Sequence, residues 1–413
     1  MTGSMGRRGF IARLAQGTML GAVAIDGRLH RSVAHWLQHA EHADLARSSP
    51  YHMVIFGDSI AWGQGLREEQ KYSTLVQNWL AQRLSGQRIV KWTFAHSGAV
   101  IGPDANDNLS PVAGEVPVPY PSVLAQLSNS TSYLAHHPET DADHAAPVSP
   151  ESVSLVLVNG GINDVNVRDI LTVDPTIADP ESWIRGLARH RCVERMQDQL
   201  LPRLLSTFPN AQVIVTGYYA IVSPDTRLGD LEKLLDELGL LGELGALGVT
   251  ELVRKKLASQ CAAFADETTA GLSDVVPRAQ PLQVIASAST SSAVRRPDAP
   301  AVAALQGQGQ PQPPGRAHFV DFRMASDEAF GASQTKLWGL PASDPLAVER
   351  EQECNLLGAS VDHLTCIEAS AGHPNVDGAR LLADRIIKRI SCIMTGGKLR
   401  LPGATTQIDC VRS

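Results

Sequence analysis

The stretch Met53-Val54-Ile55-Phe56-Gly57-Asp58-Ser59 decides the fold of this chain. Its first four residues are an apolar run, which predicts a short buried strand that ends at Gly57. Small or polar residues follow, and then a helix-like run from Ser73 to Leu84. This order of strand, tight turn and helix puts Ser59 at the carboxyl end of a strand, where open α/β sheets bind their ligands.

Apolar runs later in the chain repeat this pattern. Further strands are expected at Arg88–Phe94, Val153–Val158, Gln212–Thr216 and Ala317–Phe322. Cys192–Phe208 has helical periodicity, which Pro202 is expected to kink or split, and a last helix is expected over Asp377–Met394. The repeated alternation of strands and helices predicts an α/β fold with a mostly parallel sheet.

Length and composition narrow the class of protein. The chain has 413 residues, of which 43% are hydrophobic, and this is enough for a large core in one elaborated domain or two. Its net charge of −7 and the lack of a dense Lys/Arg run give it no bulk electrostatic reason to bind nucleic acid. No apolar stretch approaches the roughly 18 residues of a membrane-spanning helix. The sequence does not set the oligomeric state.

The first residues have the pattern of an export signal. Arg7-Arg8-Gly9-Phe10-Ile11 precedes a weakly apolar stretch, Leu14–Ile25, which contains small residues. A charged head, a short apolar centre and a small-residue cleavage site are typical of a signal peptide, and the paired arginines resemble the twin-arginine type. We therefore expect residues 1–24 to direct export to the periplasm or the outside of the cell. The alternative is an ordinary N-terminal amphipathic helix.

The six cysteines fit an exported protein with three disulfides. Cys354–Cys366 and Cys392–Cys410 would close the simplest local loops, which leaves Cys192–Cys261 as the third pair. Several other pairings are open, because spacing alone does not determine connectivity. Under the alternative interpretation, the cysteines are buried free thiols in a cytosolic protein.

The region from residue 226 to residue 315 interrupts the α/β pattern. Leu228–Leu272 is rich in leucine with regular glycine interruptions, and we expect short helices inserted into the frame. They would form either a lid that docks lipid or a helix pair packed on the core, as amphipathic helices usually are. Gln280–Gly315 is rich in Ala, Ser, Pro and Gln, and is typical of a linker or a disordered loop. Residues 50–225 and 316–413 would then be the two parts of one α/β domain.

Three separated motifs carry the chemistry. Ser59 follows the first strand, Asn163 follows the strand at Val153–Val158, and His373 precedes the last helix. A serine becomes a strong nucleophile when a base removes its proton, and His373 is the candidate base. The backbone N–H groups of Ser59 and Gly98 and the side-chain amide of Asn163 are candidate donors to a developing oxyanion.

These residues resemble the four motif blocks of the SGNH (GDSL-type) hydrolases. The matching blocks, in chain order, are Gly57-Asp58-Ser59-Ile60, Gly98, Gly161-Ile162-Asn163-Asp164 and His373-Pro374-Asn375. The similarity runs from Met53 to about Cys392, apart from the Leu-rich insertion and the linker. It implies a flavodoxin-like three-layer α/β/α sandwich and hydrolysis of carboxylic esters, lipid esters among them, through an acyl-serine. It also implies that no metal or organic cofactor takes part.

One position departs from the family pattern. Its members usually carry an Asp three residues before the catalytic His, and here that residue is Ser370. Loss of the carboxylate that orients the imidazole costs about 10⁴ in rate in the best-studied triad. Glu368, a backbone carbonyl, or a more distant acid such as Asp321 or Asp362 could replace it. We favour a Ser–His dyad supported by Glu368 or by a carbonyl.

Other functions fit the same motifs. Deacetylation of a carbohydrate, or acyl transfer to an alcohol, would use the same acyl-enzyme. A non-catalytic binding module on a decayed hydrolase fold has Ser370 as its only support. Trp62 and Tyr218-Tyr219 would line an apolar acyl pocket or pack in the core.

Overall fold

The computed structural model describes residues 50–84, 87–104, 107, 121–136, 147–282, 315–340 and 370–395, and two short strands at 398–399 and 408–409. The elements discussed below belong to one unit, which comprises Tyr51–Ser85 and Ile89–Ser413. The expected signal over residues 1–24 and most of the low-complexity segment, residues 283–314, lie outside the described residues. Export and the domain boundaries therefore stay predictions.

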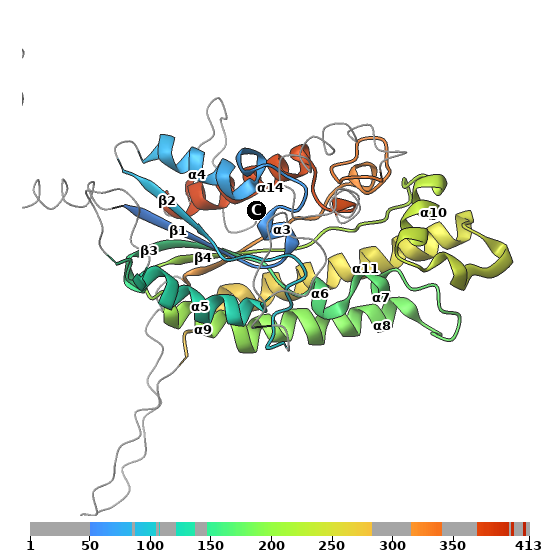
Figure 1. Cartoon of the computed structure of the whole chain (residues 1–413), viewed down its shortest axis with the longest axis horizontal. Helices are drawn as coiled ribbons and strands as arrows, with labels where there is room; N and C mark the ends of the chain where they lie inside the picture. Colours follow the sequence, from blue (N-terminus) through green and yellow to red (C-terminus); the bar gives the residue numbers. More distant parts are fainter. Residues whose placement is uncertain are drawn as a thin grey trace, which may run out of the picture. The chain divides into compact units, whose positions relative to one another are not determined.

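The centre of this unit is a sheet of five parallel strands (Figure 1). The strands are β1 (Tyr51–Phe56), β2 (Ile89–Thr93), β3 (Val153–Val158), β4 (Gln212–Thr216) and β5 (Ala317–Val320). Their order in the sheet is β2-β1-β3-β4-β5, and each neighbouring pair runs parallel. This is the flavodoxin-like order of a doubly wound sheet. The prediction of an α/β fold with a mostly parallel sheet is confirmed.

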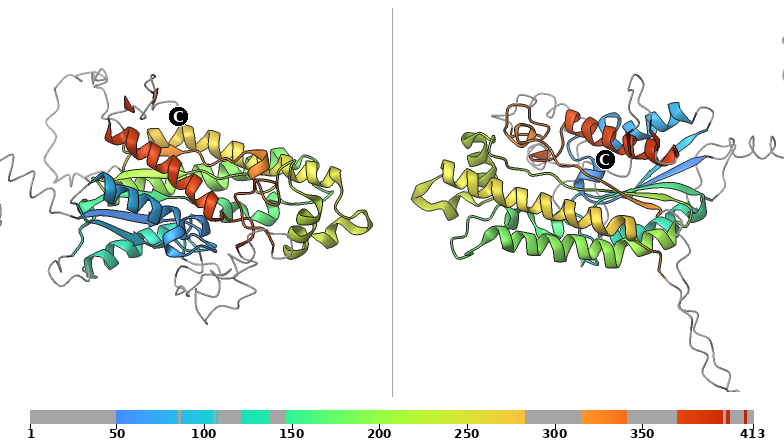
Figure 2. Two further views of the ribbon diagram at one scale, coloured as in Figure 1. Left: turned by 90° about the horizontal axis from the view of Figure 1, so that it is seen from above. Right: turned by 180° about the vertical axis from the view of Figure 1, so that it is seen from behind.

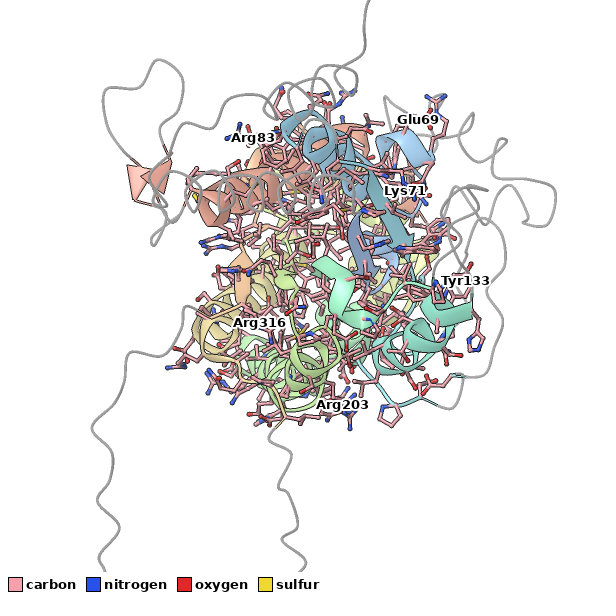
Figure 3. The ribbon with its side chains drawn as sticks, turned by 90° about the vertical axis from the view of Figure 1, so that its left-hand side faces the viewer. Glu69, Lys71, Arg83, Tyr133, Arg203 and Arg316 are labelled. Atoms are coloured by element: carbon pink, nitrogen blue, oxygen red, sulfur yellow. The ribbon has the colours of Figure 1, made fainter. Side chains whose placement is uncertain are left out.

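Helices cover both faces of the sheet (Figures 1 and 2). One layer contains α4 (Tyr72–Arg83) and α14 (Val376–Met394), and the other contains α5 (Val123–His136), α9 (Leu201–Thr207) and α11 (Glu251–Val275). In Figure 3, Arg83 of α4 and Arg203 of α9 mark these two layers on either side of the strands. The arrangement is the three-layer sandwich that the family resemblance implies.

Alternation along β1 explains why helices are needed on both sides. Successive side chains of a strand point to opposite faces, and Met53 and Ile55 belong to a different apolar cluster from Val54 and Phe56. All four side chains are completely buried. A strand that is apolar on both faces is stable only when both faces are covered, as in parallel sheets with helical crossovers.

The leucine-rich region differs from the prediction. It forms α10 (Leu228–Glu237), a 3-10 segment η5 (Leu241–Leu247) and then α11, a single helix of 25 residues where short helices were expected. Glycine in a helix interior costs about 1 kcal/mol relative to alanine, and the closely spaced glycines all precede Glu251. Only Gly271 lies within α11, so the helix continues. Because α11 buries Phe264 and packs on α8 (Pro180–Leu187), this half of the region is part of a layer. A lid role for α10 and η5 stays a prediction.

The helix expected at Cys192–Phe208 begins earlier, at Pro180. It runs through α8, then through two π-helical segments, η3 (Ala188–Val193) and η4 (Met196–Leu200), into α9. Pro202 lies in the first turn of α9, where a missing backbone N–H is tolerated. Within the ranges that the structure describes, no helix combines the length and apolar character needed to cross a membrane.

The predicted disulfide Cys192–Cys261 is wrong, because both residues are free, buried thiols. The Cys192 thiol donates to the Gly160 carbonyl over 3.3 Å. The Cys261 sulfur on α11 faces the backbone of Ile221 and Val222, and burial raises the pKa of this thiol to about 12. Pairing by elimination could not show that the two side chains face different partners. The other two predicted disulfides include Cys354, Cys366 and Cys410, which lie outside the described residues, so they stay predictions.

Candidate active site

The turn that carries Ser59 is tightly constrained. Ser59 is the first residue of the short helix α3 (Ser59–Trp62), and the Asp58 side chain caps this helix by accepting from the Ile60 N–H over 2.9 Å. Gly57 has φ +138°, and a side chain there would overlap the carboxamide oxygen of Asn159. Only glycine fits at such a position. The hydroxyl of Ser59 is thus carried on a rigid strand-to-helix turn.

His373 meets this turn from the far end of the chain. Its Nε2 lies 2.6 Å from Ser59 Oγ, although the two residues are 314 positions apart in the sequence. This distance is that of a strong hydrogen bond between a hydroxyl and an imidazole nitrogen. The two sequence motifs therefore meet in space at the carboxyl end of β1.

A short antiparallel contact holds the loop that carries His373. The backbone N–H of Trp338 donates to the His373 carbonyl over 2.8 Å, and the N–H of Gly372 donates to the Trp338 carbonyl over the same distance. Leu337 and Pro374 form an isolated β-bridge beside these bonds. The backbone on either side of the imidazole is thereby fixed to the segment that follows β5.

The group that orients His373 stays open. Ser370, which occupies the position of the usual Asp, is completely buried, and its side chain lies beside Gly65, as does the Trp338 indole. Asp321 is engaged elsewhere, because its carboxylate accepts from the Arg323 guanidinium at 2.8 and 3.0 Å. The remaining candidate acids, Glu368 and Asp362, lie outside the described residues.

The two predicted oxyanion residues lie on loops that are bonded together. Gly98, with φ +74°, is in the loop after β2, and Asn163 is in α6 (Ile162–Val165), just after β3. The Asn163 side-chain N–H donates to the Ala99 carbonyl over 3.0 Å. The Ile101 N–H donates to the Asp164 carboxylate over 2.8 Å. The loop of Gly98 and the loop of Asn163 thus form one structural unit beside Ser59.

Asp164 anchors this unit to the helical layer below it. Its side chain is 0% exposed and accepts from Arg195 Nη1 over 2.6 Å. Burial raises the pKa of the Asp164 carboxyl, and the hydrogen bond from Ile101 and the charge of Arg195 oppose this rise. Arg195 is in the helical run between η3 and η4, so this run supports the Asn163 loop from beneath.

Three further side chains link the site, and sequence reasoning assigned none of them this position. Gln126 of α5 exchanges two hydrogen bonds with the backbone of Gly57, at 3.0 and 2.9 Å. Asn159 and Tyr218 both donate to the fully buried Asp58 carboxylate over 2.7 Å. Asn159 directly follows β3, and Tyr218 lies two residues after the end of β4. These positions at strand ends were a usable signal. Gln126 is on a helix and had none.

The arrangement supplies the parts of nucleophilic catalysis. A buried serine hydroxyl touches an imidazole, and a side-chain amide and a glycine with a left-handed backbone lie on the neighbouring strand ends. Among the described residues, no group of three or more His, Cys, Asp or Glu side chains is placed to hold a metal ion.

Known proteins resemble this chain in structure at low sequence identity. No protein-family model and no curated protein matches this chain. An extracellular lipase from Streptomyces rimosus is similar in structure at 15% identity, covering 81% of this chain and 99% of that chain with a TM-score of 0.40. A phospholipase A1 from Streptomyces albidoflavus is similar at 13% identity, covering 82% of this chain and 100% of that chain with a TM-score of 0.40. An acetyl xylan esterase from Geobacillus stearothermophilus is similar at 12% identity, covering 83% of this chain and 94% of that chain with a TM-score of 0.26.

Proposed function

We propose that this chain is a serine hydrolase of the SGNH (GDSL-type) family, which cleaves carboxylic esters through an acyl-serine intermediate. The observation that carries the proposal is the 2.6 Å contact between Ser59 Oγ and His373 Nε2. The order of the motif blocks in the sequence and the flavodoxin-like order of the strands support it. Lipid esters, as in a lipase, are the substrates that we propose first.

In the first step, His373 Nε2 takes the proton of Ser59 as the serine oxygen attacks the carbonyl carbon of the ester. Negative charge develops on the carbonyl oxygen. The backbone N–H groups of Ser59 and Gly98 and the Asn163 amide stabilise it, each donor contributing about 3 kcal/mol. The Asn163 amide has two hydrogens. One is bonded to the Ala99 carbonyl, and the second is the donor to the oxyanion.

In the second step, the protonated His373 gives its proton to the departing alcohol, and the acyl group stays on Ser59. Water then attacks the acyl-serine with His373 again as the base, and the carboxylic acid leaves. Every proton transfer in this scheme passes through one imidazole nitrogen. The orientation of the His373 ring is therefore important for the rate.

We further propose that Glu368 or a backbone carbonyl orients this ring. A Glu368→Gln variant separates the two, since it removes the charge and keeps the size of the side chain. If the Glu368 carboxylate is the partner, kcat falls by up to about 10⁴, as in a triad that loses its acid. If a carbonyl is the partner, kcat stays within about twofold of the wild type.

The experiment that tests the function is hydrolysis of p-nitrophenyl esters of increasing acyl length by the wild type and by Ser59→Ala. We expect Ser59→Ala to lose at least about 10⁴ in kcat/KM, because no other group replaces the nucleophile. Ser273→Ala is the matched control, since Ser273 is an exposed serine on α11 whose hydroxyl donates to the Ala270 carbonyl of the same helix. It should keep full activity.

Two results would contradict the proposal. One is ester hydrolysis that persists in Ser59→Ala at more than a few per cent of the wild-type rate. The other is failure of a serine-directed fluorophosphonate to label Ser59 in the folded protein. Acetylated xylan belongs in the same panel, because activity on it alone would make the enzyme a carbohydrate deacetylase.

A further inference from the structure

Two consecutive tyrosines lie at the end of β4 and reach the candidate active site from its buried side. Tyr218 is 0% and Tyr219 is 4% exposed. We propose that this pair positions the two halves of the catalytic machinery: Tyr218 holds the Ser59 turn against the Asn163 loop, and Tyr219 holds the backbone that carries His373. The inference rests on the proposed function and adds two positioning residues to it.

Tyr218 joins the two segments by two hydrogen bonds. Its hydroxyl donates to Asp58 Oδ2 over 2.7 Å, and it accepts from the Ile162 N–H at 3.3 Å. Asp58 is the residue before Ser59, and Ile162 is the residue before Asn163. One phenol oxygen therefore contacts the immediate neighbours of the nucleophile and of an oxyanion donor.

The Asp58 carboxylate makes the Tyr218 bond important. It is completely buried, and its Oδ1 accepts from the Ile60 N–H and from the Asn159 amide, at 2.9 and 2.7 Å. Its Oδ2 accepts from Tyr218. Without the tyrosine hydroxyl, a buried carboxylate oxygen and the buried Ile162 N–H would both lose a partner, which a well-packed interior does not tolerate without movement.

Tyr219 reaches the other half of the site. Its hydroxyl donates to the Gly372 carbonyl over 2.8 Å, and this carbonyl belongs to the peptide bond that joins Gly372 to His373. Gly372 has φ +77°, a conformation that glycine adopts readily. The Tyr219 ring packs edge-on against the Phe322 ring, with 5.4 Å between the ring centroids. The Tyr219 hydroxyl therefore has little freedom to follow a moving loop.

The neighbouring positions explain how one dipeptide serves both halves. Both tyrosines follow β4 and belong to one apolar cluster, but their rings pack on different neighbours. Tyr218 packs against Phe264 of α11, and Tyr219 packs against Phe322 after β5. Since both rings are buried and both hydroxyls are bonded within the protein, these residues pack in the core.

The test compares three variants that each remove one phenol hydroxyl. Tyr218→Phe should lower kcat by about 10- to 100-fold with KM within about twofold, because small displacements of reacting groups cost up to about 10² in rate. Tyr219→Phe should lower kcat by about tenfold. Tyr72→Phe is the matched control, since Tyr72 is also buried and its hydroxyl has no hydrogen-bond partner among the described residues. It should keep kcat within about twofold.

A second readout reports the Tyr218 bond directly. Amide hydrogen exchange at Ile162 should be at least about tenfold faster in Tyr218→Phe than in the wild type, and unchanged in Tyr72→Phe. Replacing Tyr218 by 4-aminophenylalanine restores a donor at the same place, and this variant should regain most of the lost kcat. If Tyr218→Phe does not fold, the 4-aminophenylalanine variant alone decides: activity supports the inference, and a folded, inactive protein overturns it.

The outcomes for the two proposals are distinct. Wild-type kcat in Tyr218→Phe, with Ser59→Ala inactive, overturns this inference and leaves the proposed function intact. A wild type that neither hydrolyses esters nor reacts with fluorophosphonate overturns the proposed function. In that case Ile162 exchange still decides the inference, which fails if exchange is the same in Tyr218→Phe and in the wild type.

Discussion

Two Arg–Asp pairs in this protein have similar chemistry and very different surroundings. At the carboxyl edge of the sheet, Arg195 donates to Asp164, whose side chain is 0% exposed. At the end of α11, Arg278 pairs with Asp274, and both side chains are more than 60% exposed. The first pair holds the loop of a candidate oxyanion donor, and the second lies in water.

The difference shows which region of this protein is most sensitive to substitution. Buried polar groups at the carboxyl edge have specific partners, and removal of one partner leaves another group desolvated without a bond. Exposed groups on the helices exchange a protein partner for water at little cost. Equivalent substitutions in the two regions should therefore change the free energy of unfolding by different amounts.

The largest effect is expected for Gly161→Ala. Gly161 has φ +124°, and a Cβ there would overlap Cys192 Sγ. Backbone strain of about 2 kcal/mol and overpacking of about 2 kcal/mol should together lower the free energy of unfolding by about 4 kcal/mol in urea denaturation. Since Asn163 follows two residues later, kcat should fall as well.

Gly186→Ala is the control for this substitution. Gly186 is in α8, and a Cβ added there would meet nothing within 4 Å. Alanine should stabilise the helix there by about 0.5 to 1 kcal/mol. Equal stability of the two alanine variants would remove the contrast between the two regions.

A smaller effect is expected for Arg195→Met. The Asp164 carboxylate keeps its bond from the Ile101 N–H and loses its charged partner, which should cost about 2 kcal/mol at neutral pH. Burial already raises the pKa of Asp164 in the folded state. When burial raises the pKa of a carboxyl, the carboxyl lowers the stability of the fold least below its unfolded pKa of about 3.9, where it is neutral in both states. Stability is then lost as the pH rises through the folded pKa.

Removal of the Arg195 cation raises the pKa of Asp164 further. The stability difference between Arg195→Met and the wild type should therefore grow as the pH rises and shrink as the pH falls toward the unfolded pKa of about 3.9. Thermal melts across this range measure it. Arg203→Met, an exposed arginine of α9 (Figure 3), is the control and should differ from the wild type by less than about 0.5 kcal/mol at every pH. A pH-independent loss in Arg195→Met would show that packing, and not charge, is responsible.

The smallest effect is expected for Arg278→Ala. Its pair with Asp274 is exposed on both sides, and such pairs contribute between about 0.2 and 1 kcal/mol, less as salt is added. Urea denaturation at low salt and at about 1 M salt should show a difference of less than about 0.5 kcal/mol that disappears at high salt. A loss as large as that of Arg195→Met would mean that burial does not distinguish the two pairs.

Much of the fold was predictable from local patterns. Val153–Val158 and Gln212–Thr216 are observed with the expected bounds, because an uninterrupted apolar run between polar turns has few other structures open to it. The approach of Ser59 and His373 was also expected, since a serine nucleophile needs a base within reach and His373 was the candidate base. Their roles in catalysis remain a proposal.

The remaining features depend on contacts between distant segments. Tyr218 appears in the sequence as one aromatic residue after a strand, and nothing local shows that its hydroxyl meets Asp58, 160 positions earlier. Cys192 and Cys261 could be paired only by elimination, and packing gives each a different backbone partner. The group that orients His373 could not be predicted for the same reason, because several segments distant in the sequence could supply it.

The separation of Ser59 and His373 also has a consequence for synthesis of the protein. Ribosomes add about 5 to 20 residues per second, so the serine emerges some tens of seconds before the histidine, 314 positions later. During that interval β2 to β5 are synthesised, and His373 is not yet part of the chain. A nascent or truncated chain that ends before residue 373 lacks this imidazole. Under the proposed function, the Ser59 hydroxyl would therefore meet its base only after nearly all of the described fold has been translated.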